Sequence, residues 1–104
     1  MNPAKVRRDQ LQQLTDLPNV GPAMARDLQL LGISRPDQLV GRDPVALYTE
    51  LAVLTASRQD PCVLDVFISI TRFMNGDDPQ PWWKFTAERQ RLQRSQRLFV
   101  GEEH

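Results

Sequence analysis

The sequence predicts a single all-α domain, and three observations carry this prediction. Apolar residues recur at helical spacing, and no segment alternates apolar and polar residues as a strand would. Acid–proline pairs at Asp43-Pro44 and Asp60-Pro61 are typical of helix starts, because the acid can cap the helix and proline suits its first turn. A chain of 104 residues has the length of one domain with one core.

The first predicted elements are two short helices, Arg8–Leu14 and Pro22–Leu31, joined by a tight turn. We expect Asn19 to adopt the left-handed conformation, which asparagine tolerates, and Gly21 to adopt a positive φ. Pro22 then begins the second helix, where its missing N–H costs little. The backbone N–H groups at the start of that helix are free to hold a phosphate.

The middle of the chain predicts two further helices. Ser34 is typical of an N-cap with Asp37 as its capping-box partner, and this short helix runs to about Val40 and ends at Gly41. The next helix covers Pro44–Thr55. Its apolar stripe consists of Val45, Tyr48, Leu51, Ala52 and Thr55, with Leu47 and Leu54 beside it.

A helix from Pro61 to about Asn75 is apolar on most sides, which predicts the buried centre of the domain. Only Asp65, Ser69 and Arg72 form a polar line along it. Its apolar positions are Val63, Leu64, Val66, Phe67, Ile68, Ile70, Phe73 and Met74. The turn Gly76–Pro79 follows, and its acid pair suits a turn and a helix cap better than a metal site.

The last predicted helix, Pro81–Arg97, has one apolar and one basic face. Trp82, Phe85, Leu92 and Phe99 fall on the arc that we expect to dock on the core. Lys84, Arg91, Arg94 and Arg97 lie opposite, with Trp83 pointing into the basic sector. Basic residues beside an aromatic ring can neutralise phosphates and stack on bases. The alternative is a solvated helix face whose charges balance acids elsewhere.

The turn segment resembles the helix-hairpin-helix motif of DNA-binding proteins that lack sequence specificity. The matching residues are Leu17, Val20, Gly21, Ala25 and Leu28. Asn19 replaces the first glycine of the motif, Ala23 replaces a residue that often helps to hold phosphate, and Arg26 is the nearest basic residue. The resemblance implies a phosphate contact at this hairpin. The alternative is a hairpin that only packs helices.

A second resemblance covers about Leu14 to Arg91. The segments DPCVLDVF (60–67) and PWWKFTAERQ (81–90), after a helix-hairpin-helix unit, resemble a small bacterial family labelled pathogenicity-locus or mitomycin-resistance proteins. These labels are genetic, so the resemblance implies the fold and no particular activity.

Composition sets further bounds. Thirteen basic and thirteen acidic residues give zero net charge, so any binding of nucleic acid must use local patches. One cysteine excludes an internal disulfide and fits a reducing cytoplasm, which is the predicted location. We expect neither a secretory signal nor a membrane span, and no cofactor or metal.

Little in the sequence indicates an enzyme. Cys62 lies in the first turn of a helix, where the dipole can lower a thiol's pKa, but a nucleophile also needs a base. The single histidine is His104. We therefore interpret Cys62 as a packed small apolar residue.

The sequence thus predicts a helix-hairpin-helix unit with following helices over residues 8–55, and a central helix with a basic C-terminal helix over 60–99. The leading function is non-enzymatic binding of DNA without sequence preference. The alternative is a SAM-like module that binds protein partners. The candidate nucleic-acid contacts are Asn19, Val20, Gly21, Ala23, Arg26, Trp83, Lys84, Arg91 and Arg94.

Overall fold

The computed structural model describes the backbone of residues 6–101 and the side chains of residues 6–95. All regular structure in this range is helical, as predicted. The α-helices are α1 (Pro22–Leu30), α2 (Pro44–Thr55), α3 (Pro61–Met74) and α4 (Thr86–Gly101). The 3-10 turns are η2 (Arg8–Gln10), η3 (Leu14–Asp16), η4 (Pro36–Leu39) and η5 (Trp82–Phe85). None of the helices in the described range is long and apolar enough to cross a membrane.

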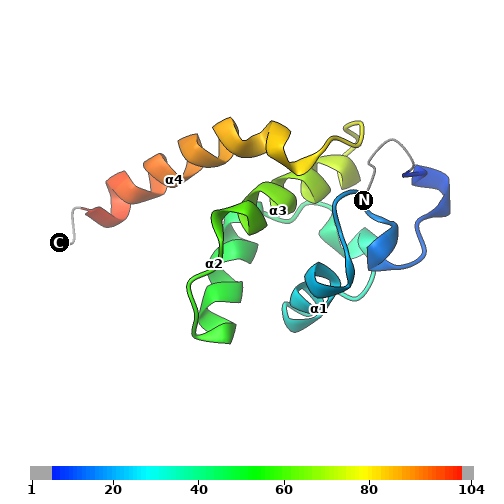
Figure 1. Cartoon of the computed structure of the whole chain (residues 1–104), viewed down its shortest axis with the longest axis horizontal. Helices are drawn as coiled ribbons and strands as arrows, with labels where there is room; N and C mark the ends of the chain where they lie inside the picture. Colours follow the sequence, from blue (N-terminus) through cyan, green and yellow to red (C-terminus); the bar gives the residue numbers. More distant parts are fainter. Residues whose placement is uncertain (1–5, 102–104) are drawn as a thin grey trace.

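Helix α3 is the centre of the domain, as its apolar sequence predicts. It packs against α2, η4, η5 and α4, while α1 packs against α2 and η3 (Figure 1). Eight consecutive residues of α3, from Leu64 to Thr71, are buried. The helix is therefore covered on all sides over two turns. The rest of the core comes mainly from Leu14, Leu17, Val20, Leu28, Leu31, Ile33, Leu39, Leu47 and Leu51.

Both acid–proline pairs begin helices as predicted. The Asp43 carboxylate accepts a hydrogen bond of 2.9 Å from the Val45 N–H, and Asp60 accepts one of 2.8 Å from the Cys62 N–H. Each bond satisfies a backbone donor that has no partner inside its helix. In α2 the buried residues are Leu47 and Leu51, whereas Leu54 is exposed. The core-facing side of α2 is thus narrower than the predicted stripe.

The predicted helix Arg8–Leu14 is wrong, because this segment forms only η2 before the separate turn η3. The Asp16 carboxylate accepts hydrogen bonds of 2.9 Å from the N–H groups of both Gln12 and Gln13. Local side-chain bonds of this kind compete with helical backbone bonds. The segment is also too short to be a stable helix alone. The first helix of a helix-hairpin-helix motif is therefore not confirmed.

The predicted capping box of Ser34 and Asp37 is also wrong. The carboxamide oxygen of Gln38 accepts hydrogen bonds from the N–H groups of Ser34, at 2.7 Å, and Arg35, at 2.9 Å. A side chain one residue further along thus takes the expected role, and Arg35 is the N-cap of η4. The Asp37 carboxylate pairs with the Arg35 guanidinium at 3.2 Å instead.

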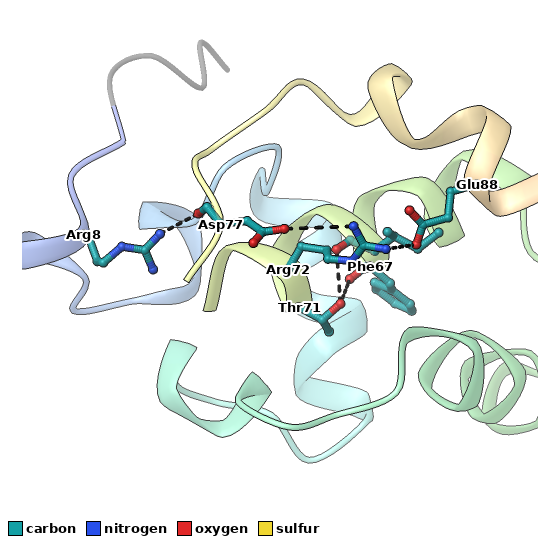
Figure 2. Close-up of polar contacts among 7 residues, drawn as sticks. Arg8, Phe67, Thr71, Arg72, Asp77 and Glu88 are labelled. Carbon is teal, nitrogen blue, oxygen red and sulfur yellow. Dashed lines mark hydrogen bonds and ion pairs between the residues drawn. The ribbon is translucent and has the colours of Figure 1, made fainter. Parts of the chain in front are cut away.

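The C-terminal end of α3 is held by a polar network (Figure 2). The Arg72 guanidinium pairs with the carboxylates of Glu88, in α4, and Asp77, in the turn after α3. The Arg8 guanidinium donates to the carbonyls of Phe73 and, at 2.6 Å, Asp77, and it lies 4.0 Å from the centre of the Phe73 ring. Carbonyls at a helix C-terminus have no partner in their own helix, and Arg8 adds a second donor to the Phe73 carbonyl, which also accepts the Gly76 N–H at 3.1 Å.

Candidate nucleic-acid interface

The turn before α1 reverses the chain at Asn19 and not at Gly21. Asn19 has a φ of 66°, as predicted, whereas Gly21 has φ −97° and ψ −175°. The predicted positive φ of Gly21 is therefore wrong. Pro22 is the physical reason, because a residue before proline is driven to extended backbone. Gly21 is instead the N-cap of α1, and a Cβ built on it meets no atom within 4 Å.

The hairpin residues divide into buried and exposed sets. Val20 is 1% exposed and belongs to the core, so its side chain cannot contact a ligand. Gly21, Ala23 and Arg26 are exposed, and Arg26 makes no hydrogen bond or ion pair with another described residue. The exposed part of the hairpin is therefore the start of α1 and its first basic side chain.

Asn19 connects the hairpin to the C-terminal part of the chain. Its amide donates to the Ser69 hydroxyl at 3.1 Å and to the Gln80 carbonyl at 2.8 Å. Gln80 lies two residues before η5, the turn that contains Trp83 and Lys84. The structure therefore brings the hairpin turn close to the start of the basic segment. No pattern in the sequence predicts this long-range contact.

The two tryptophans of η5 have different environments. Trp82 is half-buried and packs against the core, as predicted. Trp83 is 57% exposed, and the Lys84 ammonium lies 5.5 Å from the centre of its ring. An exposed indole with a cation beside it can accept a stacked base and a phosphate at the same position.

The described residues of the predicted basic face, Lys84, Arg91 and Arg94, are all exposed. Arg91 and Arg94 are exposed, and neither makes an ion pair with another described residue. Arg97 and Phe99, both predicted to face specific sides of this helix, lie outside the residues whose side chains are described. The helix runs past α3 and away from α1 (Figure 1). Arg91 and Arg94 thus form a part of the surface separate from the hairpin.

Arg89 lies within the basic segment, but its side chain pairs with an acid of α3 and is not available to a ligand. Its Nε donates to the Asp65 carboxylate at 2.9 Å, and Thr86 donates to the other oxygen of the same carboxylate at 2.8 Å. Asp65 is fully buried, and the Arg89 side chain is 15% exposed. Asp65, one residue of the polar line predicted on α3, therefore binds two side chains of α4. The sequence signal that could have indicated this ion pair is Asp65 itself, because an acid inside an otherwise apolar helix needs a partner when it is buried.

The surroundings of Cys62 do not favour a reactive thiol. Its hydrogen bond with the Asp60 carboxylate, followed by burial, raises the pKa of the thiol, which is opposite to the lowering expected from the start of a helix. The side chain is half-buried. His104 lies outside the described residues. Within them, no three His, Cys, Asp or Glu side chains are grouped in a way that could hold a metal ion.

Known proteins resemble this chain over most of its length. The model of a protein family described as Pathogenicity locus matches residues 7–91. Mitomycin resistance protein McrB from Streptomyces lavendulae is 43% identical over 79 residues, which cover 76% of this chain and 75% of that protein. No solved structure matches the chain.

Proposed function

The chain belongs to the pathogenicity-locus family, and we propose that it is a non-enzymatic protein that binds DNA without sequence preference. The binding surface in this proposal has two parts. One is the exposed start of α1 with Arg26, together with Trp83 and Lys84, whose segment the Asn19–Gln80 hydrogen bond joins to the hairpin turn. The other is the pair Arg91 and Arg94 on α4.

The observation that carries the proposal is the exposed Trp83 ring beside the Lys84 ammonium. Burying a large aromatic ring is strongly favourable, so a ring that stays more than half in water is available to a ligand. Stacking of one base on an aromatic side chain is worth about 1–3 kcal/mol and does not depend on the base. Such a contact explains affinity without sequence preference.

The charges on the outer side of α4 support the same proposal. Two other charged residues of this region, Glu88 and Arg89, are paired with Arg72 and Asp65. When these paired charges are left out of the count, Lys84, Arg91 and Arg94 form a local excess of positive charge in a protein with no net charge. Sequence-independent affinity for nucleic acid comes mainly from such neutralisation of phosphates.

The proposal assigns no catalytic residue. The raised pKa of Cys62 and its acidic neighbour disfavour a thiolate at neutral pH, and a carboxylate bonded to a backbone N–H is a poor base.

Fluorescence anisotropy with labelled mixed-sequence DNA, single-stranded and duplex, tests the proposal. We expect a Kd of about 10⁻⁴ to 10⁻⁶ M at physiological salt and a linear fall of log K with log salt. Arg91→Ala and Arg94→Ala should each reduce the slope by about 0.9 for duplex DNA if each contacts one phosphate. Arg58→Ala is the matched control, because Arg58 is exposed outside both parts of the surface.

Two further variants separate the parts of the surface. Trp83→Ala should weaken single-stranded binding more than duplex binding, since only unpaired bases offer a face for stacking. Gly21→Glu should nearly abolish binding, because it places a carboxylate at the start of α1, where there is space for the side chain. Absence of any binding at low salt by a correctly folded protein would refute the proposal.

A second candidate function, a module for protein partners, is favoured by a different surface. Leu30, Val40, Val53 and Leu54 are apolar and each more than half exposed. Exposed apolar residues can mark an interface when they are contiguous. The exposure of Trp83 favours nucleic acid over this alternative. Sedimentation of the purified protein at several concentrations tests whether copies of the chain associate.

A further inference from the structure

A cavity of about 280 Å³ lies between the turn η3 and the exposed side of α1. Its walls include Leu14 and, from α1, Arg26 and Gln29, with Thr15 at the η3 side and Ser34 after α1. This volume lies just below the range of about 300–1,000 Å³ for ligand pockets. It fits a phosphate group with a few attached atoms better than a whole dinucleotide.

Three of the polar side chains that line this cavity are donors without partners in the described fold. Arg26, Thr15 and Gln29 make no side-chain hydrogen bond with a described residue, in contrast to Ser34, whose hydroxyl bonds the Gln38 side chain at 3.2 Å. A guanidinium, a hydroxyl and a carboxamide together present several N–H and O–H donors. The ligand that they suit is an anion with several acceptor oxygens.

The cavity also lacks the acids that would repel such a ligand. No carboxylate lines it. The acid next to it in sequence is Asp16, whose carboxylate instead accepts the N–H groups of Gln12 and Gln13. A larger cavity of about 400 Å³ beside η5 is lined by Asp77 and Asp78 and has no basic residue in its lining. The two cavities thus differ in charge, and only the one beside α1 suits an anion.

We propose that the cavity beside α1 binds a phosphate group through Thr15, Arg26 and Gln29. The group comes either from free phosphate or from the backbone of a nucleic acid, and the second source rests on the proposed function. The site differs from the hairpin contact, because it uses side chains on the flank of α1 and not the backbone at Gly21.

The test is a titration of ¹⁵N-labelled protein with inorganic phosphate at constant ionic strength, followed by NMR. We expect saturable shifts of the Thr15, Arg26 and Gln29 amide signals and none at Asp77 or Asp78. Arg26→Gln should weaken this binding about tenfold, because it removes a charge-assisted hydrogen bond. Arg58→Gln is the matched control and should leave the shifts unchanged. Circular dichroism checks that the Arg26→Gln and Arg58→Gln variants are folded.

A second arm uses a single-stranded oligonucleotide without terminal phosphates and also records the fluorescence of Trp83 in a Trp82→Phe background. Shifts at the cavity in both arms support the inference with nucleic acid as a source. Shifts with phosphate but no binding of the oligonucleotide support the inference with free phosphate as the source, and the proposed function then fails. Quenching of Trp83 without cavity shifts in either arm overturns the inference and leaves the proposed function standing. No response in either arm overturns both.

Discussion

Replacing Arg89 with alanine should destabilise the fold far more than replacing its neighbour Arg91. Arg89 donates to the fully buried Asp65 carboxylate at 2.9 Å, and its own side chain is 15% exposed. Its removal leaves a buried charge with one remaining side-chain donor, the Thr86 hydroxyl. Breaking a buried pair in this way costs about 3–5 kcal/mol, and the partial exposure of Arg89 places our estimate at about 3 kcal/mol.

Thermal and urea unfolding, followed by circular dichroism, measure this effect. A loss of about 3 kcal/mol corresponds to a Tm lower by roughly 15 °C in a domain of this size. Arg91→Ala removes an exposed guanidinium from the same helix and should change stability by no more than about 0.5 kcal/mol.

A double variant separates the cost of an unpaired charge from the value of the pair. Asp65→Leu with Arg89→Met should recover most of the stability lost in Arg89→Ala, because apolar residues of similar size often replace a buried pair without loss. If Arg89→Ala is as stable as Arg91→Ala, the Asp65 carboxylate does not depend on Arg89 and the reasoning is wrong.

Gly21→Ala should change the free energy of unfolding by less than about 0.5 kcal/mol, whereas Gly76→Ala should cost about 1 kcal/mol or more, because Gly76 has a φ of 115°; equal losses in urea unfolding would contradict this. Asn19→Gly keeps the left-handed backbone but removes two side-chain hydrogen bonds, so a loss of about 1 kcal/mol or more is expected, and a stabilised variant would show that these bonds contribute nothing. Cys62 should react slowly with a thiol reagent at neutral pH, because its raised pKa leaves less thiolate, and quickly after unfolding. Asp60→Asn retains a capping oxygen and should speed the native reaction; an unchanged rate would mean that Asp60 does not control the thiol.

The parts of the fold that the sequence predicted well are set by nearby residues. The starts of α2 and α3 depend on a carboxylate and the N–H two residues later, so Asp43 and Asp60 could be recognised without tertiary information. The burial of α3 follows from apolar residues on nearly all its sides. At the start of η4, either Asp37 or Gln38 could accept the free backbone N–H groups, and sequence spacing alone predicted the wrong residue.

The candidate site was less predictable, because its arrangement depends on distant contacts. Asn19 forms a hydrogen bond with Gln80, 61 residues away in the sequence, and Asp65 forms one with Arg89, 24 residues away. A helical projection separates Arg89 from the exposed Arg91, because residues two apart lie on nearly opposite faces, but it does not identify Asp65 as the partner of Arg89. The sequence could propose which residues are basic, but only the packing of α4 on α3 decides which of them remain available.

The bond from Arg8 to the Phe73 carbonyl has a consequence for the order of folding. It joins residues 65 apart in the sequence, so it can form only after α3 has been synthesised and has become helical. Closing so long a loop costs entropy, and local helices therefore form before it does. During synthesis the segment around Arg8 precedes α3, so this bond must wait for the later helix whose end it contacts. In a fragment that begins after Arg8, the Phe73 carbonyl would keep only its hydrogen bond of 3.1 Å from the Gly76 N–H, and the link between the two segments would be lost.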